Sequence, residues 1–237
     1  MRRRVVLITA LLGLVAGGLQ AATSQDVSFR TDDGVTIAAT LYLPARSGPG
    51  VILLHALGRT REEWHAVATR LADAGFVALA IDLRGHGASG PLPEGTDLED
   101  LTKMMADVRA ARAFLGSRRE VAPNQIGLAG ASIGANLSIL FAANDPTVRS
   151  LVLLSPGIDY RGLRPEAAMK KYAGRPALLV ASQEDNYSAN AARQLATTGP
   201  GIRELRILSG AGHGTTMMAR QPDLAAALVD WFRRTLL

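Results

Sequence analysis

The stretch IGLAGASIGANLSIL, residues 126–140, carries the pentapeptide Gly130-Ala131-Ser132-Ile133-Gly134 in its middle. A short apolar run, IGLAGA, precedes the serine, and a longer run of apolar and small residues follows it up to Ala143. Short, nearly continuous apolar runs are typical of strands that are covered on both faces of a sheet. We therefore expect a buried strand, a sharp turn at Ser132 and a buried helix over residues 135–143.

The pattern Gly-x-Ser-x-Gly between a strand and a helix is typical of a nucleophile elbow, a strained turn that lifts the serine hydroxyl above the sheet. The two flanking glycines are then needed because a side chain at either place would collide with the neighbouring strand or helix. In such a turn the N–H of Ile133 points toward a developing oxyanion. The alternative is a glycine-rich β–α turn, which has no need of a serine.

The elements around this turn predict one doubly wound α/β domain. The segments 26–30 and 35–43 alternate apolar and polar residues about the turn signal Asp33-Gly34, which predicts an antiparallel N-terminal hairpin. Apolar runs that predict further strands alternate with segments of helical periodicity. The result is a mostly parallel sheet of about eight strands in a domain over residues 26–237. The further strands are expected at 51–56, 76–82, 126–131, 151–155, 177–182 and 205–208, and the other helices at 62–74, 98–115, 186–197 and 223–236.

Composition narrows the class of protein. The chain has 237 residues, of which 48% are hydrophobic and 20% charged, as in an ordinary globular protein. Three of its five net positive charges come from Arg2, Arg3 and Arg4. The other basic residues are scattered rather than clustered, so we expect no nucleic-acid partner.

The first 22 residues have the three parts of a secretory signal peptide: a cationic tip, an apolar stretch over residues 5–19, and small residues at Ala21 and Ala22. The apolar stretch is shorter than the roughly 20 residues of a spanning helix, so we expect no stable membrane span after cleavage. An uncleaved anchor is the alternative. The chain contains no cysteine, which excludes a lipid-anchored lipobox, disulfides and a thiol nucleophile. A bacterial periplasmic or secreted protein is expected.

A serine nucleophile needs a base to take its proton. His55 and His86 precede the serine in the chain, and His65 lies on the predicted helix 62–74, where we expect it to face solvent. His213, in SGAGHGTTM (209–217), follows the last predicted strand and comes after the serine. The chain order serine, acid, histidine favours His213 as the general base. The alternative is a loop histidine that serves only to form a turn.

The third group of such a site is a carboxylate at a strand end between Ser132 and His213. The segment VASQEDNYS (180–188) offers Glu184 and Asp185. We favour Asp185, because it directly precedes a predicted helix and its short side chain can be held rigidly to fix the histidine tautomer. Asp159 follows the preceding strand end and is a competitor, whose alternative role is to tie down its own loop.

With these residues in order, the chain resembles the α/β-hydrolase superfamily, nearest its small dienelactone-hydrolase-like and esterase members. The resemblance covers residues 26–237 and implies that Leu57, after His55 and Ala56, gives the second oxyanion N–H beside that of Ile133. Ala56 stands where the family has glycine. Because position 132 is serine, the members with a cysteine or an aspartate nucleophile are excluded or disfavoured. The segments that carry the resemblance are VILLHALGRTREEW (51–64), IDLRGHGASG (81–90), GASIG (130–134), ASQED (181–185) and GAGHG (210–214).

The resemblance implies a serine hydrolase that cleaves carboxylic esters, with no metal or organic cofactor. The interval 156–176 has room for one short helix around residues 165–172, so we expect little or no lid and a small or soluble ester substrate. Tyr160 and Met217, with Met218, are candidates for the acyl pocket, although such residues often only pack a loop. A serine peptidase or amidase of the same fold and a non-catalytic binding scaffold are the alternative functions.

Overall fold

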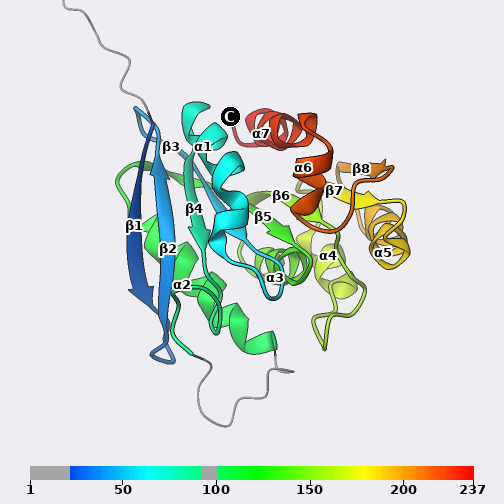
Figure 1. Ribbon diagram of the computed structural model, residues 1–237, viewed down its shortest axis with the longest axis horizontal. Helices are drawn as coiled ribbons and strands as arrows, with labels where there is room; N and C mark the ends of the chain where they lie inside the picture. The colour runs from blue at the N-terminus through cyan, green and yellow to red at the C-terminus, as the bar shows by residue number, and fades with distance from the viewer. Residues whose placement is uncertain (1–21, 92–100) are drawn as a thin grey trace, which may run out of the picture.

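The structure is a computed structural model that describes residues 22–91 and 101–237. Its centre is an eight-stranded sheet of order β1-β2-β4-β3-β5-β6-β7-β8, in which β1 and β2 are antiparallel and the remaining strands run parallel (Figure 1). This confirms the predicted fold class. The strands are β1 (Thr23–Arg30), β2 (Thr36–Leu43), β3 (Gly48–Leu54), β4 (Val77–Ile81), β5 (Val121–Ala131), β6 (Val148–Leu154), β7 (Ala177–Ser182) and β8 (Arg203–Leu208).

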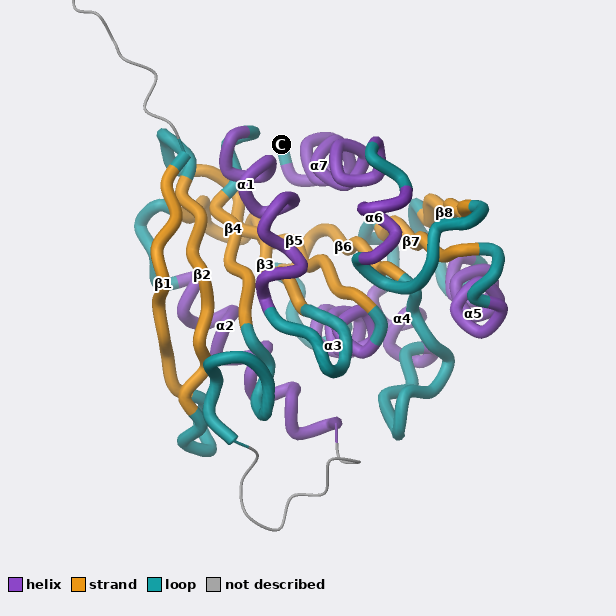
Figure 2. The backbone as a smooth tube through the Cα atoms, viewed as in Figure 1, coloured by secondary structure: helices purple, strands orange, loops and turns teal. Residues whose placement is uncertain are grey.

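Helices cover both faces of the sheet (Figure 2). Helices α1, α6 and α7 pack on one face, and α2, α3, α4 and α5 pack on the other. The helices are α1 (His65–Asp73), α2 (Met105–Gly116), α3 (Ile133–Ala142), α4 (Glu166–Tyr172), α5 (Asn186–Ala196), α6 (Thr216–Arg220) and α7 (Asp223–Leu236), with 3₁₀ turns η1 (Arg61–Trp64) and η2 (Leu101–Met104).

The predicted elements all have counterparts, with differences at their ends. The turn after β5 goes directly into α3, which begins at Ile133 rather than at residue 135. The expected helix 62–74 begins as the 3₁₀ turn η1, and the short helix α6 had no counterpart in the prediction. Residues 1–21 of the predicted signal peptide and the first three residues of the expected helix 98–115 lie outside the described residues. Within the described residues, no helix is both long and apolar enough to cross a membrane.

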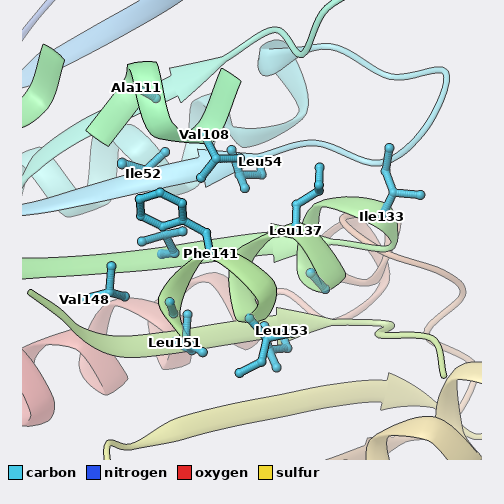
Figure 3. Packing of buried hydrophobic residues seen from close by; sticks show 14 of the residues in the cluster. Ile52, Leu54, Val108, Ala111, Ile133, Leu137, Phe141, Val148, Leu151 and Leu153 are labelled. Carbon is cyan, nitrogen blue, oxygen red and sulfur yellow. The ribbon is translucent and has the colours of Figure 1, made fainter. Parts of the chain in front are cut away.

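The core explains why the apolar runs are continuous. Alternate side chains of one strand enter opposite layers: Ile52 and Leu54 of β3 pack toward α2 and α3, whereas Val51 and Leu53 pack toward α1 and α7. Figure 3 shows the first of these layers, where Phe141 of α3 lies beside Ile52. A strand that is buried on both sides accepts few polar side chains, so its sequence is a nearly continuous apolar run.

The strand order places the turn at Ser132 at the centre of the molecule. The chain moves from β3 to β4 on one side, then crosses to β5 on the other, so that β3 and β5 are neighbours with Leu54 paired to Gly130. This is a topological switch point, where the loops after two adjacent strands diverge and leave room for a ligand. The loop after β3 and the turn after β5 therefore lie together at the carboxyl edge.

Candidate active site

Ser132 lies at a strained turn between β5 and α3. Its backbone has φ 55° and ψ −116°, a conformation that non-glycine residues rarely adopt, and such strain costs on the order of 1–3 kcal/mol. A Cβ at Gly130 would lie 2.0 Å from the carbonyl oxygen of Gly134, and one at Gly134 would lie 2.4 Å from the carbonyl oxygen of Leu54. Both glycines are therefore required by close backbone approach, which is the geometry of a nucleophile elbow.

His213 and Asp185 meet at the same edge of the sheet. The Nδ1 atom of His213 lies 2.6 Å from Oδ2 of Asp185. Asp185 is also the N-cap of α5, where its Oδ1 accepts a hydrogen bond from the N–H of Ser188 at 3.3 Å. The carboxylate is thus held from two sides. With Nδ1 bonded to a carboxylate, Nε2 is the basic nitrogen of the imidazole.

The carboxylate of Asp185 stays ionised despite its partial burial. Burial alone would raise the pKa of Asp185, but the hydrogen bonds from His213 and Ser188 outweigh it and hold the pKa below its usual value. An ionised carboxylate at Nδ1 fixes the orientation and the tautomer of the imidazole.

The two competing carboxylates are engaged elsewhere. Asp159 accepts hydrogen bonds from the Gly162 N–H at 2.7 Å and the Arg164 side chain at 2.6 Å, so it ties down its own loop. Glu184 accepts a hydrogen bond from the Gly210 N–H at 2.8 Å. Among Asp159, Glu184 and Asp185, it is Asp185 that contacts His213.

The loop that carries His213 is pinned along its length. Oγ of Ser182, at the end of β7, accepts hydrogen bonds from the N–H groups of Ala211 at 3.0 Å and Gly212 at 3.2 Å. Oγ of Ser155, at the end of β6, accepts one from the N–H of Gly214 at 2.9 Å. Two buried serines at neighbouring strand ends therefore fix the position of the histidine backbone.

Leu57 and Ile133, the predicted oxyanion donors, lie on the two loops that meet at the switch point. Within residues 22–91 and 101–237, neither N–H has a recorded protein acceptor. The neighbouring N–H groups of Ala56 and Gly58 donate instead to Glu63 at 2.9 Å and to His86 at 3.1 Å. The N–H groups on both sides of Leu57 are thus bonded, which holds the backbone around Leu57 in place.

His55 and His86 support this loop rather than the reacting groups. Nε2 of His55 accepts a hydrogen bond from the Leu83 N–H at 2.9 Å, and its Nδ1 donates to the Ala56 carbonyl at 2.7 Å. Burial lowers the pKa of His55 to about 4, so the ring is neutral at pH 7. The fourth histidine, His65, is exposed on α1, as expected, and contacts Tyr42.

Ser132 and His213 open onto a common cavity of about 260 Å³. Six of its eight lining residues are polar or charged; the lining consists of Ala56, Leu57, Arg59, Glu63, Ser132, His213, Thr215 and Thr216. Met217 does not line it: this side chain is fully buried against the strands of the α1/α7 layer, because helix α6 turns it into the core. Its assignment to the acyl pocket is therefore wrong.

Tyr160 is half-buried and does not line the cavity, but its hydroxyl lies near Ser132. It is 3.3 Å from the Ser155 carbonyl oxygen and 3.4 Å from Oγ of Ser188. Burial raises the pKa of Tyr160, against an opposing contribution from hydrogen bonds with Ser188 and Ser132. Tyr160 thus lies close to Ser132 without lining the cavity.

The family model of the serine aminopeptidases S33 matches residues 48–175, which is more than half of the chain. The chain belongs to this family of α/β hydrolases. The match includes the loop after β3, the turn at Ser132 and the strand β6, but ends before Asp185 and His213.

Curated relatives agree with this membership. The chain is 32% identical to the polyketide transferase ATR5 of Stachybotrys chlorohalonatus over 58% of its own length and 46% of the relative. It is 29% identical to a monoacylglycerol lipase of Mycolicibacterium smegmatis over 65% of its length and 55% of the lipase. The chain therefore spans about half the length of these curated relatives.

Solved structures share the fold over nearly the whole chain. The DcsB complex with its substrate analogue superposes with a TM-score of 0.80 at 17% identity, covering 90% of this chain and 99% of that one. The dienelactone hydrolase of Anabaena variabilis gives 0.74 at 20% identity, covering 92% and 100%. At these identities the likeness is one of fold.

Several residues of this S33 hydrolase site were absent from the sequence-based prediction. Glu63 has the appearance of a surface charge at the start of a helix, and Thr215, Ser155 and Ser182 are common strand-end or loop residues. Glu63 directly precedes Trp64, and a tryptophan next to it was a signal that the sequence offered, because large aromatic residues are highly buried on average.

Proposed function

We propose that the chain is a serine hydrolase that cleaves carboxylic esters of small or soluble substrates. One observation carries the proposal: a serine on a strained turn opens onto the same cavity as a histidine whose Nδ1 is bonded to an aspartate. A binding protein gains nothing from the strain at Ser132 or from a carboxylate held on an exposed imidazole. The membership in a hydrolase family supports the same conclusion.

In the first step, Nε2 of His213 takes the proton of the Ser132 hydroxyl while Oγ attacks the ester carbonyl carbon. The carbonyl oxygen becomes an oxyanion that accepts hydrogen bonds from the N–H groups of Leu57 and Ile133. Asp185 stabilises the imidazolium without taking its proton. The bond to the alkoxy group then breaks, and His213 gives the proton to the leaving alcohol.

In the second step, a water molecule repeats the attack on the acyl-enzyme. His213 takes one proton of the water, the oxyanion forms again at Leu57 and Ile133, and the bond to Ser132 breaks. The proton returns to Oγ of Ser132, and the free acid leaves. The strained turn keeps Oγ fixed through both steps, so the reaction needs little reorganisation.

Replacement of Ser132 tests the proposal directly. We expect Ser132→Ala to lower kcat/KM for p-nitrophenyl acetate by about 10⁴-fold and to abolish labelling by a fluorophosphonate, because the triad residues act as a unit. Ser138→Ala, six residues after Ser132 in α3, is the matched control, since its hydroxyl donates to the Gly134 carbonyl. Wild-type turnover and labelling in Ser132→Ala would exclude the assignment.

A peptidase is the second candidate, favoured by the description of the matched family. The same residues cleave an amide when the leaving amine is protonated and positioned. Comparison of p-nitrophenyl acetate with an aminoacyl-p-nitroanilide on the wild-type protein separates the two. A higher kcat/KM for the anilide would favour the peptidase over the esterase.

A further inference from the structure

Glu63 is a carboxylate in the cavity wall that the proposed mechanism does not use. It lies in η1, between Arg61 and Trp64, and shares the cavity with Ser132 and His213. The turn is anchored on both sides: Trp64 is fully buried, and the Arg61 N–H donates to Asp82 at 2.7 Å. The side chain of Glu63 is therefore held in place and not free to turn into solvent.

The two carboxylate oxygens of Glu63 join two loops. Oε1 accepts a hydrogen bond from the Ala56 N–H at 2.9 Å, and Oε2 accepts one from Oγ1 of Thr215 at 2.8 Å. Ala56 directly precedes Leu57, and Thr215 follows His213 by two positions. One side chain thus connects the backbone that offers an oxyanion N–H with the loop that carries the base.

This carboxylate has an energetic cost that its contacts offset. Burial raises the pKa of Glu63, against the opposing hydrogen bonds from Ala56 and Thr215. A negative charge near a forming oxyanion also opposes the reaction in the proposed mechanism. A residue kept at such a place needs a compensating benefit, and the fixed distance between the two loops supplies one.

We infer that Glu63 is a positioning residue, a hydrogen-bonded link that holds the oxyanion loop and the His213 loop in one geometry. The inference rests on the proposed function for its catalytic consequence, but the link itself is independent of that function. It acts through Leu57 and His213, and contributes no atom to the reaction. Glutamine is expected to replace glutamate here, because its amide oxygen accepts from Ala56 while its NH₂ donates to the Thr215 hydroxyl.

The test compares Glu63→Ala, Glu63→Gln and Thr215→Val by steady-state kinetics with p-nitrophenyl acetate. We expect Glu63→Ala to lower kcat about 10- to 100-fold with little change in KM, because loss of a positioning contact acts on the transition state. Glu63→Gln should stay within about threefold of wild type. Thr215→Val should lower kcat less than Glu63→Ala does. The double variant Glu63→Ala/Thr215→Val should have the same kcat as Glu63→Ala alone, because both changes remove one link.

Ser150→Ala is the control for a merely structural loss. Its buried hydroxyl forms a hydrogen bond of 2.7 Å with Thr235, and neither residue lines the cavity. Wild-type kcat in Glu63→Ala, or a loss in Glu63→Gln as large as in Glu63→Ala, would overturn the inference. Absence of ester turnover in the wild type would instead count against the proposed function. Amide hydrogen exchange then decides the link: faster exchange in residues 56–60 and 210–215 of Glu63→Ala supports it, and unchanged exchange refutes it.

Discussion

Gly134 packs directly against the backbone at the end of β3. A Cβ at this position would lie 2.4 Å from the Leu54 carbonyl oxygen and 2.8 Å from that of His55, which are backbone atoms of a central strand and its loop. We expect Gly134→Ala to reduce the free energy of unfolding by about 1–3 kcal/mol, as overpacking does. Urea unfolding measures this. Gly174→Ala is the control, because a Cβ there would meet nothing within 4 Å.

The Gly134→Ala variant should also affect catalysis. The displaced atoms belong to the strand end that carries Leu57, so Gly134→Ala should also lower kcat for p-nitrophenyl acetate, by at least tenfold if the loop moves by about 1 Å. Unchanged stability and turnover in Gly134→Ala would show that the backbone contact at Leu54 is not tight in solution.

Residue chemistry explains which site residues the sequence predicts. Ser132 and His213 stand in motifs whose glycines mark unusual backbone, and Asp185 stands where a strand end meets a helix start. Their roles stay predictions, but the structure brings Asp185 to His213 and places His213 on the cavity of Ser132. Glu63 was missed because its partners lie 7 and 152 positions away, and no local pattern encodes such contacts.

At the scale of elements, the junction between β3 and its loop is pH-sensitive. His55, directly after β3, has its pKa lowered by burial to about 4 from the usual 6.5. The unfolded chain therefore binds a proton that the folded chain does not, and stability is lost as pH falls from 6.5 toward 4. By pH 5 this loss amounts to about 2 kcal/mol relative to pH 7.

Urea unfolding of wild type and His55→Gln at pH 7 and pH 5 measures this loss. We expect the glutamine variant to lose about 2 kcal/mol less than wild type between the two pH values, whatever its stability at pH 7. His65→Gln is the control, since His65 is exposed on α1. An equal pH dependence in His55→Gln and wild type would show that another group carries it.

Strands and helices were predicted best where their side chains pack into the core. The buried strands were predicted within a few residues because burial on both faces leaves a continuous apolar run. Helix α6 was missed because five residues are too few to show a period. The neighbours of each strand come from the path of the chain between strands, so the sequence pattern did not fix the position of β3 between β4 and β5.

The open position of the cavity in the molecule predicts the length of the acyl group that the site accepts. The described chain between β6 and β7 contains one helix, the seven-residue α4, and the cavity of about 260 Å³ lies at the exposed carboxyl edge of the sheet. Pockets that enclose drug-sized ligands have volumes of roughly 300–1,000 Å³ and are mainly apolar, so a long acyl chain finds little surface here. We therefore expect short acyl groups to react best.

A series of p-nitrophenyl esters from acetate to dodecanoate measures this preference. We expect kcat/KM to reach its highest value between acetate and butyrate and not to rise beyond butyrate, because each further CH₂ stays in water and gains none of the roughly 0.8 kcal/mol that burial provides. Turnover should follow a simple hyperbola through the solubility limit of each ester. A rise in kcat/KM with chain length, or a jump in rate when the ester forms droplets, would show that the protein completes a larger apolar site on binding.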